Sequence, residues 1–323
     1  MGQDIAMRVC AITGAGGSAR FCTGLVRVVD PTDVTIVVNT GDDERMRGLH
    51  VSPDIDTVLY HLAEGADWDR FWGLADETFV VQDRYRSLVE RLGGSEDDLQ
   101  EWFALGDRDL ATNMLRTRLL ALGRTLTEAT DGVRRALGVA SRVLPMSDDY
   151  VPTKLTTGSG ERLDFQTYFV RRQQDEEIAG VEYVGADGAR PAPGVLEAIG
   201  DADVFVIPPS NPILSIGPIL ALPGVREAIR ERAAPRLAIS PLIGGKAVKG
   251  PTDRLLQTLG YEVSSVGVAT IYRGLVDVFV LDESDAQSAQ RIDALGMRVL
   301  VLDTMMSGPE AAARVAKDVL DAL

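Results

Sequence analysis

The stretch RVCAITGAGGSARFCTGLVRVV, residues 8–29, decides the fold. It begins with an apolar strand-like run, continues through a glycine turn and ends in a segment that favours a helix. A second strand-like run, DVTIVVNT, follows at 33–40. Strands that alternate with helices in this way indicate a mostly parallel sheet covered by helices on both faces.

The same alternation returns in the second half of the chain. Short apolar runs rich in β-branched residues predict strands at 203–212, 236–245, 277–284 and 297–306. Helical patterns are present at 218–233, 251–260, 286–296 and 309–323. The sequence therefore predicts an α/β fold with a mostly parallel, Rossmann-like sheet.

Two segments interrupt this alternation. From about 68 to 140 nearly every residue favours a helix, and this length exceeds one crossover, so we predict a helical insertion. From about 151 to 185 a Gly-Ser-Gly turn stands between alternating segments, which predicts a β-hairpin. Because no linker or repeat separates these parts, we expect residues 1–323 to form a single domain.

The composition excludes several classes of function. The 323 residues carry a formal net charge of −15, which disfavours nucleic acid and anionic lipid as partners. The chain has neither the roughly 20-residue apolar run of a membrane span nor the layout of a signal peptide. Its two cysteines lack metal-type spacing, and two histidines leave little material for a zinc site or a Ser-His-Asp relay. We expect a cytoplasmic protein.

An unusual concentration of carboxylates follows the second strand, in VVNTGDDERMRGLHVSPDIDT at 37–57. The oxygen-bearing side chains of interest there are Asn39, Asp42, Asp43, Ser52, Asp54 and Asp56. Such hard oxygen ligands suit magnesium. Two alternatives stay open: Asp54 is placed to cap the helix after Pro53, and Asp42–Asp43 fits a solvated turn.

Four further loops are rich in turn-forming and charged residues. TGAGGSAR lets the backbone approach a ligand and offers a helix N-terminus to phosphate, although it matches neither the dinucleotide pattern nor a P-loop. The other three are LGDRDLAT at 105–112, PPSNPILSIGPIL at 208–220 and SPLIGGKAVKGP at 240–251. Together with the acidic stretch, these loops predict a site for a phosphorylated substrate and a metal ion.

Several motifs, in this order, resemble the 2-phospho-L-lactate transferase family of coenzyme F-420 biosynthesis. They are NTGDD at 39–43, SPDIDT at 52–57, LGDRDLAT at 105–112, LPMSDD at 144–149, PSNPILSIGPILALPG at 209–224, SPLIGGKAVKGP at 240–251 and DTMM at 303–306. The resemblance extends from the first strand to the last helix. It implies an α/β fold, a homodimer and a transferase of substituted phosphate groups.

The resemblance also implies a reaction. The terminal hydroxyl of the deazaflavin Fo attacks a phosphorus of a guanosine diphosphate adduct of lactate or of a related three-carbon acid. The phospho-acid, which is 2-phospho-L-lactate or a phosphoenolpyruvyl or phosphoglyceryl group, moves to Fo. GMP leaves, and Mg²⁺ is required as the cofactor.

Site residues follow from the same motifs. Asp54, Asp56 and Arg108 are the expected catalytic residues, and Asp43, Asp54 and Asp56 the expected metal ligands. Which of Asp54 and Asp56 binds the metal and which contacts the attacking hydroxyl stays open. The expected substrate-binding residues are Gly14, Gly16, Gly17, Ser18, Asn39, Thr40, Asp107, Asp109, Asp148, Ser210, Asn211, Gly244 and Lys249.

Two departures from the family pattern stand out. The first loop usually has paired glycines, often followed by Lys, so here an anion contact falls to Arg20 or to the backbone. Asn113 stands where His usually follows LGDRDLAT, and an asparagine cannot carry a proton. The alternative function is a non-catalytic regulatory protein that binds nucleotide sugars or dinucleotides. A Rossmann dehydrogenase is excluded by the first loop.

Overall fold

A seven-stranded sheet forms the centre of the computed structural model, which describes residues 7–63, 65–70, 72–93, 99–248 and 250–323. All pairings in this sheet are parallel. The strands, in spatial order, are β14 (Arg298–Leu302), β13 (Val278–Asp282), β10 (Arg236–Ile239), β9 (Val204–Ile207), β1 (Val9–Thr13), β2 (Val34–Val38) and β5 (Arg142–Pro145). The predicted parallel sheet is confirmed.

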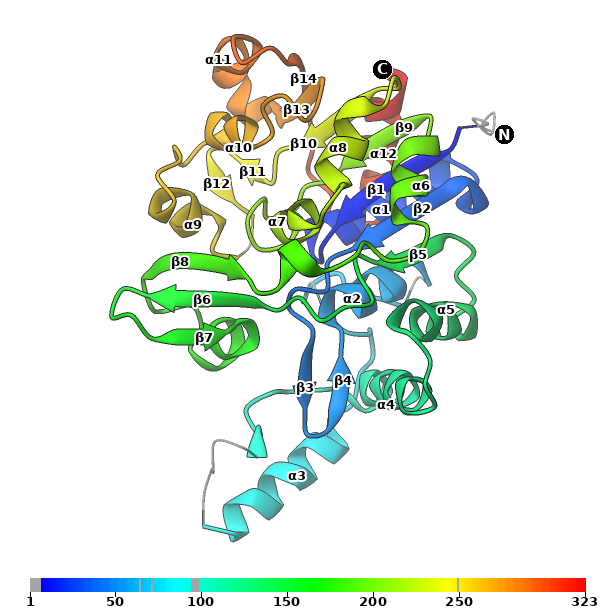
Figure 1. Cartoon of the computed structure of the whole chain (residues 1–323), viewed down its shortest axis with the longest axis vertical. Helices are drawn as coiled ribbons and strands as arrows, with labels where there is room; N and C mark the ends of the chain where they lie inside the picture. The colour runs from blue at the N-terminus through cyan, green and yellow to red at the C-terminus, as the bar shows by residue number, and fades with distance from the viewer. Residues whose placement is uncertain (1–6, 64, 71, 94–98, 249) are drawn as a thin grey trace.

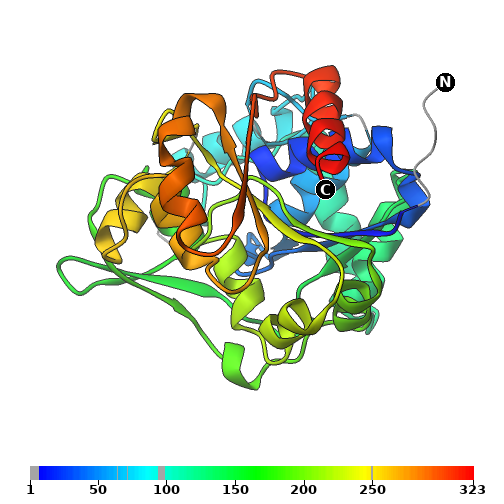
Figure 2. The same cartoon turned by 90° about the horizontal axis from the view of Figure 1, so that it is seen from above.

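Helices cover both faces of the sheet (Figures 1 and 2). Side chains alternate along β1, so that Val9 and Ala11 pack on one face and Cys10 and Ile12 on the other. The first face carries α1 (Gly17–Val28), α2 (Pro53–Leu62), α5 (Leu126–Ala136) and α12 (Pro309–Asp321). The second carries α6 (Val195–Asp201), α7 (Ile216–Ala221), α8 (Val225–Glu231), α9 (Thr252–Thr258), α10 (Ser265–Ile271) and α11 (Ala289–Asp293).

The order of the strands creates a switch point beside β1. The chain runs from β1 to β2 and β5 on one side, then returns to β9 and continues to β14 on the other. In open parallel sheets, ligands bind outside the carboxyl ends of the strands at such a point. The loops after β1 and β9 contain the predicted TGAGGSAR and PPSNPILSIGPIL segments. The fold therefore brings these two loops together.

The insertion between β2 and β5 is only partly helical. It contains the hairpin of β3 (Glu44–Met46) and β4 (Leu49–Val51), followed by α2, α3 (Val80–Arg91), α4 (Asp107–Ala121) and α5. Helix α3 extends away from the sheet (Figure 1). The prediction that nearly all of 68–139 is helical is wrong for the described residues of 68–79 and for 100–106. These are loops because their apolar side chains, such as Trp72 and Phe103, line a cavity instead of a helix interface.

The predicted hairpin is present and has a third strand. Strand β6 (Thr153–Thr157) pairs antiparallel with both β7 (Arg162–Asp164) and β8 (Ile178–Tyr183). A π-helical turn, η3 (Thr167–Arg171), connects β7 to β8. The short remaining elements are β11 (Leu242–Ile243), β12 (Lys246–Ala247) and the 3-10 turns η1 (Pro31–Asp33), η4 (Ala186–Gly188) and η5 (Glu283–Ser288). Among the described helices, none is both long enough and apolar enough to cross a membrane.

Candidate active site

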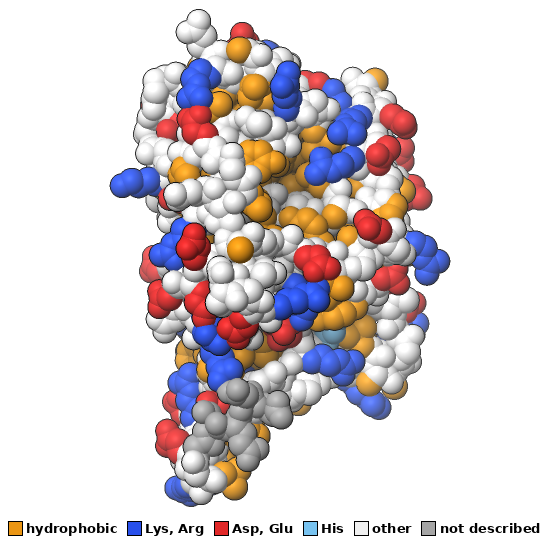
Figure 3. Space-filling view, turned by 60° about the vertical axis from the view of Figure 1, so that its left-hand side comes forward, with side chains coloured by type: hydrophobic (Ala, Val, Ile, Leu, Met, Phe, Trp, Pro, Cys, Tyr) orange, Lys and Arg blue, Asp and Glu red, His pale blue; other side chains and the backbone are white. Residues whose placement is uncertain are grey.

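A cavity of about 420 Å³ opens at the carboxyl end of the sheet. The loops after β1, β9, β10 and β14 contribute to its wall, together with α2, the start of α4 and the turn η3. Hydrophobic side chains gather in the hollowed part of the surface, and charged side chains surround them (Figure 3). The predicted loops thus meet at one place, except that LGDRDLAT begins α4 and does not follow a strand.

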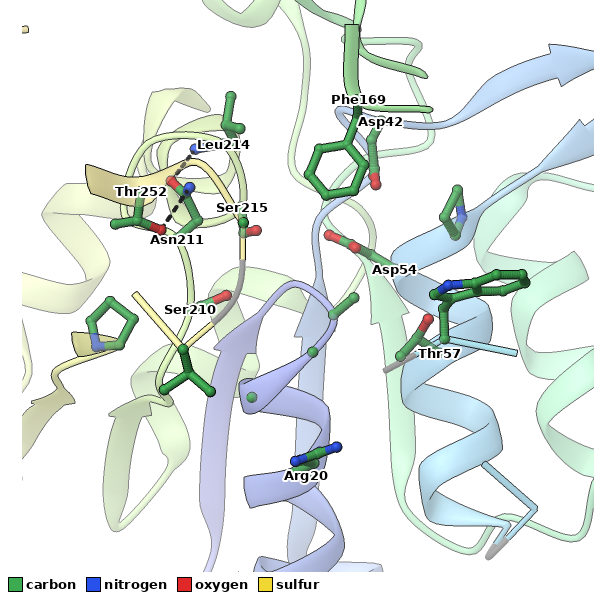
Figure 4. A pocket seen from close by; sticks show the side chains of 18 of the residues that line it. Arg20, Asp42, Asp54, Thr57, Phe169, Ser210, Asn211, Leu214, Ser215 and Thr252 are labelled. Atoms are coloured by element: carbon green, nitrogen blue, oxygen red, sulfur yellow. Dashed lines mark hydrogen bonds between the residues drawn. The ribbon is translucent and has the colours of Figure 1, made fainter. Parts of the chain in front are cut away.

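Two buried carboxyls form the acidic floor of this cavity. Asp42 and Asp54 lie close enough for the charge on one to affect the pKa of the other. The Asn39 amide donates from Nδ2 to Asp42 Oδ1 at 3.2 Å and to Asp54 Oδ2 at 2.9 Å. Both carboxyls point into the space between the first loop and Phe169 (Figure 4). Asp54 therefore reaches across to the sheet loops, and it makes no capping hydrogen bond to its own helix α2.

Burial of like charges perturbs the pKa values of this pair. Burial raises the pKa of Asp54 to about 7, and the nearby Asp43 carboxylate adds to the rise. The pKa of Asp42 lies well above its usual value, first because of burial and then because of the charge on Asp54. Two carboxylates in contact cannot both ionise cheaply without a cation between them. The floor is thus suited to a cation.

Asp43, the other member of the DD pair, turns away from this floor. Its Oδ2 accepts hydrogen bonds from Ser52 Oγ at 2.7 Å and from His50 Nε2 at 3.1 Å. It lines a second cavity of about 670 Å³ together with Thr40. Asp43 Oδ1 and Thr40 Oγ1 are buried and have no hydrogen-bond partner among the described residues.

Asp56 lies on the cavity wall but is bound to Arg116. The fully buried guanidinium donates to Asp56 Oδ2 at 2.9 Å and also to Asp56 Oδ1. Within the described ranges, no three His, Cys, Asp or Glu side chains are arranged to hold a metal ion. Arg116 thus engages Asp56 and Ser52 engages Asp43, and the ligand set of Asp43, Asp54 and Asp56 stays a prediction.

The glycine loop after β1 packs closely against the acidic floor. A Cβ at Gly14 would lie 2.5 Å from Ser215 Oγ and 2.8 Å from Asp54 Oδ2. Gly14 N donates to Ser210 Oγ at 3.3 Å. Gly16, at φ 59°, makes the sharp turn into α1, whose first residue, Gly17, also lines the cavity. The N-terminus of α1 therefore points its unpaired N–H groups at this site.

Ser210 and Asn211, in the loop after β9, also line the cavity. Asn211 Oδ1 accepts from the backbone N–H groups of Ile213 and Leu214, each at 2.9 Å, and its Nδ2 donates to Thr252 Oγ1 (Figure 4). Ser18, by contrast, is turned toward the loop itself and donates to Ala15 O at 2.7 Å. Asn211 thus fixes the shape of the loop after β9.

Arg20, one turn into α1, also lines the cavity. Its guanidinium donates to Met306 O at 3.2 Å and to Trp68 O, and it stacks on the Trp68 ring at 5.1 Å. Burial lowers the pKa of Arg20. The expected cation of the first loop is present, and it connects the loop after β14 to the segment that follows α2.

Three predicted site residues instead have structural contacts. Asp107 accepts from Val80 N and Val81 N, each at 3.0 Å, and so caps α3. Asp148 accepts from the Thr127 backbone N–H at 2.7 Å and supports the start of α5. Arg108 is exposed and donates to Ala75 O at 2.8 Å, away from the cavity lining. The structure therefore does not bring these three side chains into the cavity.

Two predicted residues belong to the SPLIGG loop. Gly244, at φ 61°, forms the turn between β11 and β12, and its neighbour Ile243 lines the cavity. Lys249 lies outside the described residues. The loop itself thus borders the site through apolar contacts.

An apolar wall of the same cavity, beside the acidic floor, was not predicted from the sequence. Phe165 and Phe169 stack with ring centroids 5.4 Å apart and planes 12° from parallel. Trp72 and Phe103 contribute further aromatic surface to the same cavity. The sequence did contain one indication of this wall, because Phe165 and Phe169 are four residues apart within the predicted hairpin region. A solvent-exposed hairpin would not need two aromatic residues there.

Comparisons with known proteins match nearly the whole chain. The family model 2-phospho-L-lactate transferase CofD matches residues 9–318. The chain is 41% identical over 319 residues to the phosphoenolpyruvate transferase of Streptomyces griseus, covering 98% of each chain. It is 38% identical over 309 residues to the 2-phospho-L-lactate transferase of Methanosarcina acetivorans, covering 96% of this chain and 97% of that one.

One solved structure is similar in fold. A member of the UPF0052 family from Bacillus halodurans superposes with a TM-score of 0.63 at 18% identity, covering 98% of this chain and 99% of that one. At this identity the likeness shows the architecture alone.

Proposed function

The chain belongs to the CofD family of 2-phospho-L-lactate transferases and is a transferase, and from this premise we propose its reaction. The protein transfers a phospho-three-carbon acid from a guanosine diphosphate adduct to the deazaflavin Fo and releases GMP, in coenzyme F-420 biosynthesis. The favoured donor is the enolpyruvyl adduct, because relatives that are 41% identical are named phosphoenolpyruvate transferases. The lactyl and glyceryl adducts are the alternatives.

The observation that carries this proposal is that one cavity combines an aromatic wall with an acidic floor. The stacked Phe165 and Phe169 rings, with Trp72, offer flat apolar surface that matches a tricyclic aromatic ring. Asp42 and Asp54 lie on the floor next to the N-terminus of α1, where a diphosphate and its counterion fit. A site for a phosphorylated substrate alone would need only the acidic floor and the N-terminus of α1, without the aromatic wall.

The acidic floor fits a magnesium ion. Asp42 and Asp54 form no ion pair with any described Lys or Arg, so their combined charge has no counterion among the described residues. Magnesium is usually held by one or two carboxylates, with substrate phosphates and water completing six ligands, so two aspartates suffice. When bound there, the ion would offset charge on the diphosphate.

The rest of the site positions the two substrates. The close packing of Gly14 against Ser215 leaves no side chain between the first loop and Asp54. Backbone N–H groups at Gly16 and Gly17 are available to phosphate oxygens. Most of the remaining lining is apolar and excludes water, which strengthens each electrostatic contact with the diphosphate.

A mass-spectrometric turnover assay tests the proposal. Purified protein is mixed with Fo, Mg²⁺ and each of the three guanosine diphosphate adducts, with and without chelator. The expected product is heavier than Fo by one phospho-acid, forms fastest with the enolpyruvyl adduct and is lost with chelator. Asp54→Asn should reduce turnover at least about 100-fold, whereas the matched change Asp33→Asn, in η1, should leave it unchanged.

A different outcome would identify a different activity. If no adduct gives product while nucleotide sugars or dinucleotides raise the melting temperature, the chain is a binding protein with a changed ligand, because a binder stabilises the folded state by mass action. If product forms equally well with chelator, the magnesium assignment is wrong and the transferase reaction stands.

A further inference from the structure

Five polar side chains form a continuous hydrogen-bonded network between α2 and α4, at one wall of the cavity. They are Asp56 and Tyr60, one turn apart on α2, and Asp109, Asn113 and Arg116, on successive turns of one face of α4. Asp56, Tyr60 and Asp109 line the cavity, whereas Asn113 and Arg116 lie behind them and are fully buried. The network therefore connects buried groups to the reacting space.

Arg116 and Asn113 fix the order of donors and acceptors in this network. Arg116 donates to both oxygens of Asp56 and, from Nη1, to Asn113 Oδ1 at 3.0 Å. Because Arg has only donors, the amide oxygen of Asn113 must face it. The Asn113 Nδ2 group therefore faces Asp109 and donates to its Oδ1 at 3.1 Å. The orientation of the amide is determined by its neighbours.

Asp109 receives a second hydrogen bond on the same oxygen. The Tyr60 hydroxyl donates to Asp109 Oδ1 at 2.7 Å. None of the described hydrogen bonds reaches Oδ2, although the side chain is only 8% exposed. One oxygen is thus held in place by two donors, and the other is available on the cavity wall.

Comparison of the four carboxylates that line the cavity distinguishes their chemistry. Asp42 and Asp54 share the Asn39 amide and form the acidic floor, so neither is a strong base when a cation is bound there. Asp56 is the counterion of a fully buried guanidinium, and protonating it would leave that charge uncompensated. Of the four, Asp109 alone neither belongs to the floor nor forms an ion pair with a described Lys or Arg.

We propose, on the basis of the proposed function, that Asp109 accepts the proton of the attacking hydroxyl, and that Tyr60 and Asn113 are positioning residues for its carboxylate. The hydroxyl oxygen of the acceptor forms a bond to the phosphorus that carries the three-carbon acid. The bond from that phosphorus to the bridging oxygen breaks, and its electron pair leaves with GMP. The hydroxyl proton moves to Asp109 Oδ2 and later to solvent.

The surroundings of Asp109 support this role. Burial raises its pKa to about 7, and the charge on Asp56 adds to the rise. The Tyr60 hydrogen bond and the Arg116 charge lower the pKa, and Glu77, whose carboxylate accepts from Asp109 N, raises it. A general base is most effective when its pKa is close to the working pH. Asn113 thus contributes an amide that orients a neighbouring base.

The test compares pH profiles of single-turnover rates at saturating enolpyruvyl adduct and Mg²⁺. Asp109→Asn should lower the rate at least about 100-fold with little change in KM. Tyr60→Phe and Asn113→Ala each remove one donor to the carboxylate, which raises its pKa. Because the ionised form is active, the acidic limb of both variants should move to higher pH by about 0.5 unit or more. The control Met114→Ala, on the exposed side of α4, should leave the profile unchanged.

A structural role would give another pattern. Lower rates in Tyr60→Phe and Asn113→Ala at every pH, with the acidic limb in its original place, would overturn the positioning roles. A rate within threefold of wild type in Asp109→Asn would overturn the proton transfer, even if that variant melts normally. If wild-type protein itself forms no product with any adduct, the proposed function fails first, and the role of Asp109 fails with it.

Discussion

Gly14 determines how closely the first loop approaches the acidic floor. Because Gly14 has no side chain, Ser215 and Asp54 can both pack directly against its backbone. Three elements, β1, α2 and the loop before α7, can meet there only because this position lacks a Cβ. The sequence identified this glycine as part of a ligand loop, and the structure adds that the Asp54 carboxyl depends on it.

Gly14→Ala should impair activity more than folding. The added Cβ displaces Asp54 or Ser215, and a misplacement of about 1 Å costs up to about 100-fold in rate. We expect turnover to fall at least about tenfold while the melting temperature changes by only a few degrees. Gly200→Ala, where a Cβ meets nothing within 4 Å, is the matched control. Unchanged turnover in Gly14→Ala would show that the loop shifts without moving Asp54.

His61 makes stability depend on pH. Burial, assisted by the Arg20 charge, lowers its pKa to about 4. In the unfolded chain the pKa of His61 is about 6.5. Below this pH the unfolded state binds more protons than the folded state, so stability decreases as the pH is lowered. Between pH 7 and 5 this one group should cost about 2 kcal/mol. Urea unfolding should therefore show a shallower pH dependence for His61→Gln than for wild type. Equal slopes would mean that the pKa of His61 is the same in the folded and unfolded states.

At the scale of elements, the motif LGDRDLAT contributes to two helices, because it caps α3 and begins α4. Its first aspartate, Asp107, caps α3, which precedes it in the chain, and its second, Asp109, lies in the first turn of α4 at the cavity wall. Both were predicted as substrate contacts because the motif belongs to the family. The structure separates them by function: one positions an element, and the other faces the site.

Asp107→Ala should loosen α3 without inactivating the protein. Loss of the two hydrogen bonds to Val80 N and Val81 N leaves the first turn of α3 without its cap. Amide hydrogen exchange at these two residues should accelerate, whereas amides within α5, which has its own capping box at Thr125, should not change. A loss of turnover comparable to that of Asp54→Asn would restore Asp107 to the site.

The elements differ in how well the sequence predicts them. Strands such as β1 and β13 are buried on both faces, so their apolar runs are sufficient to predict them. Residues 100–106 were wrongly predicted as helix because Phe103 and Leu105 form a small cluster with Met46 and Val51, far away in sequence. The Arg116–Asp56 pair and the Phe165–Phe169 wall likewise depend on contacts between distant segments, which no local pattern contains.

At the scale of the whole molecule, the first and last helices hold the sheet together. Helices α1 and α12 pack on the same face, side by side (Figure 2). Their backbones approach so closely that a Cβ at Gly24 would collide with the carbonyl oxygen of Ala312. Burial of Val315 and Val319 against this face extends the contact along α12.

Gly24→Ala should destabilise the fold even though alanine favours helices. Higher helix propensity contributes about 1 kcal/mol of stability, whereas forcing two backbones apart in a packed core costs about 1–3 kcal/mol. The collision is with backbone and not with a flexible side chain, so we expect a net loss in free energy of unfolding by urea. Gly188→Ala, where a Cβ meets nothing within 4 Å, should show no such loss. A gain in Gly24→Ala would mean that α12 moves aside freely.

The position of β1 in the middle of the sheet has a consequence for folding during synthesis. The bond from Arg8 N to Asp203, at the start of the β1–β9 pairing, joins residues 195 positions apart. As the ribosome releases the chain, β1, β2 and β5 can pair long before β9 exists. Until then β1 presents an open edge, with unpaired backbone groups that invite association with other nascent chains. The strand that positions the first loop is therefore left with one unpaired edge until residues 204–207 have been synthesised.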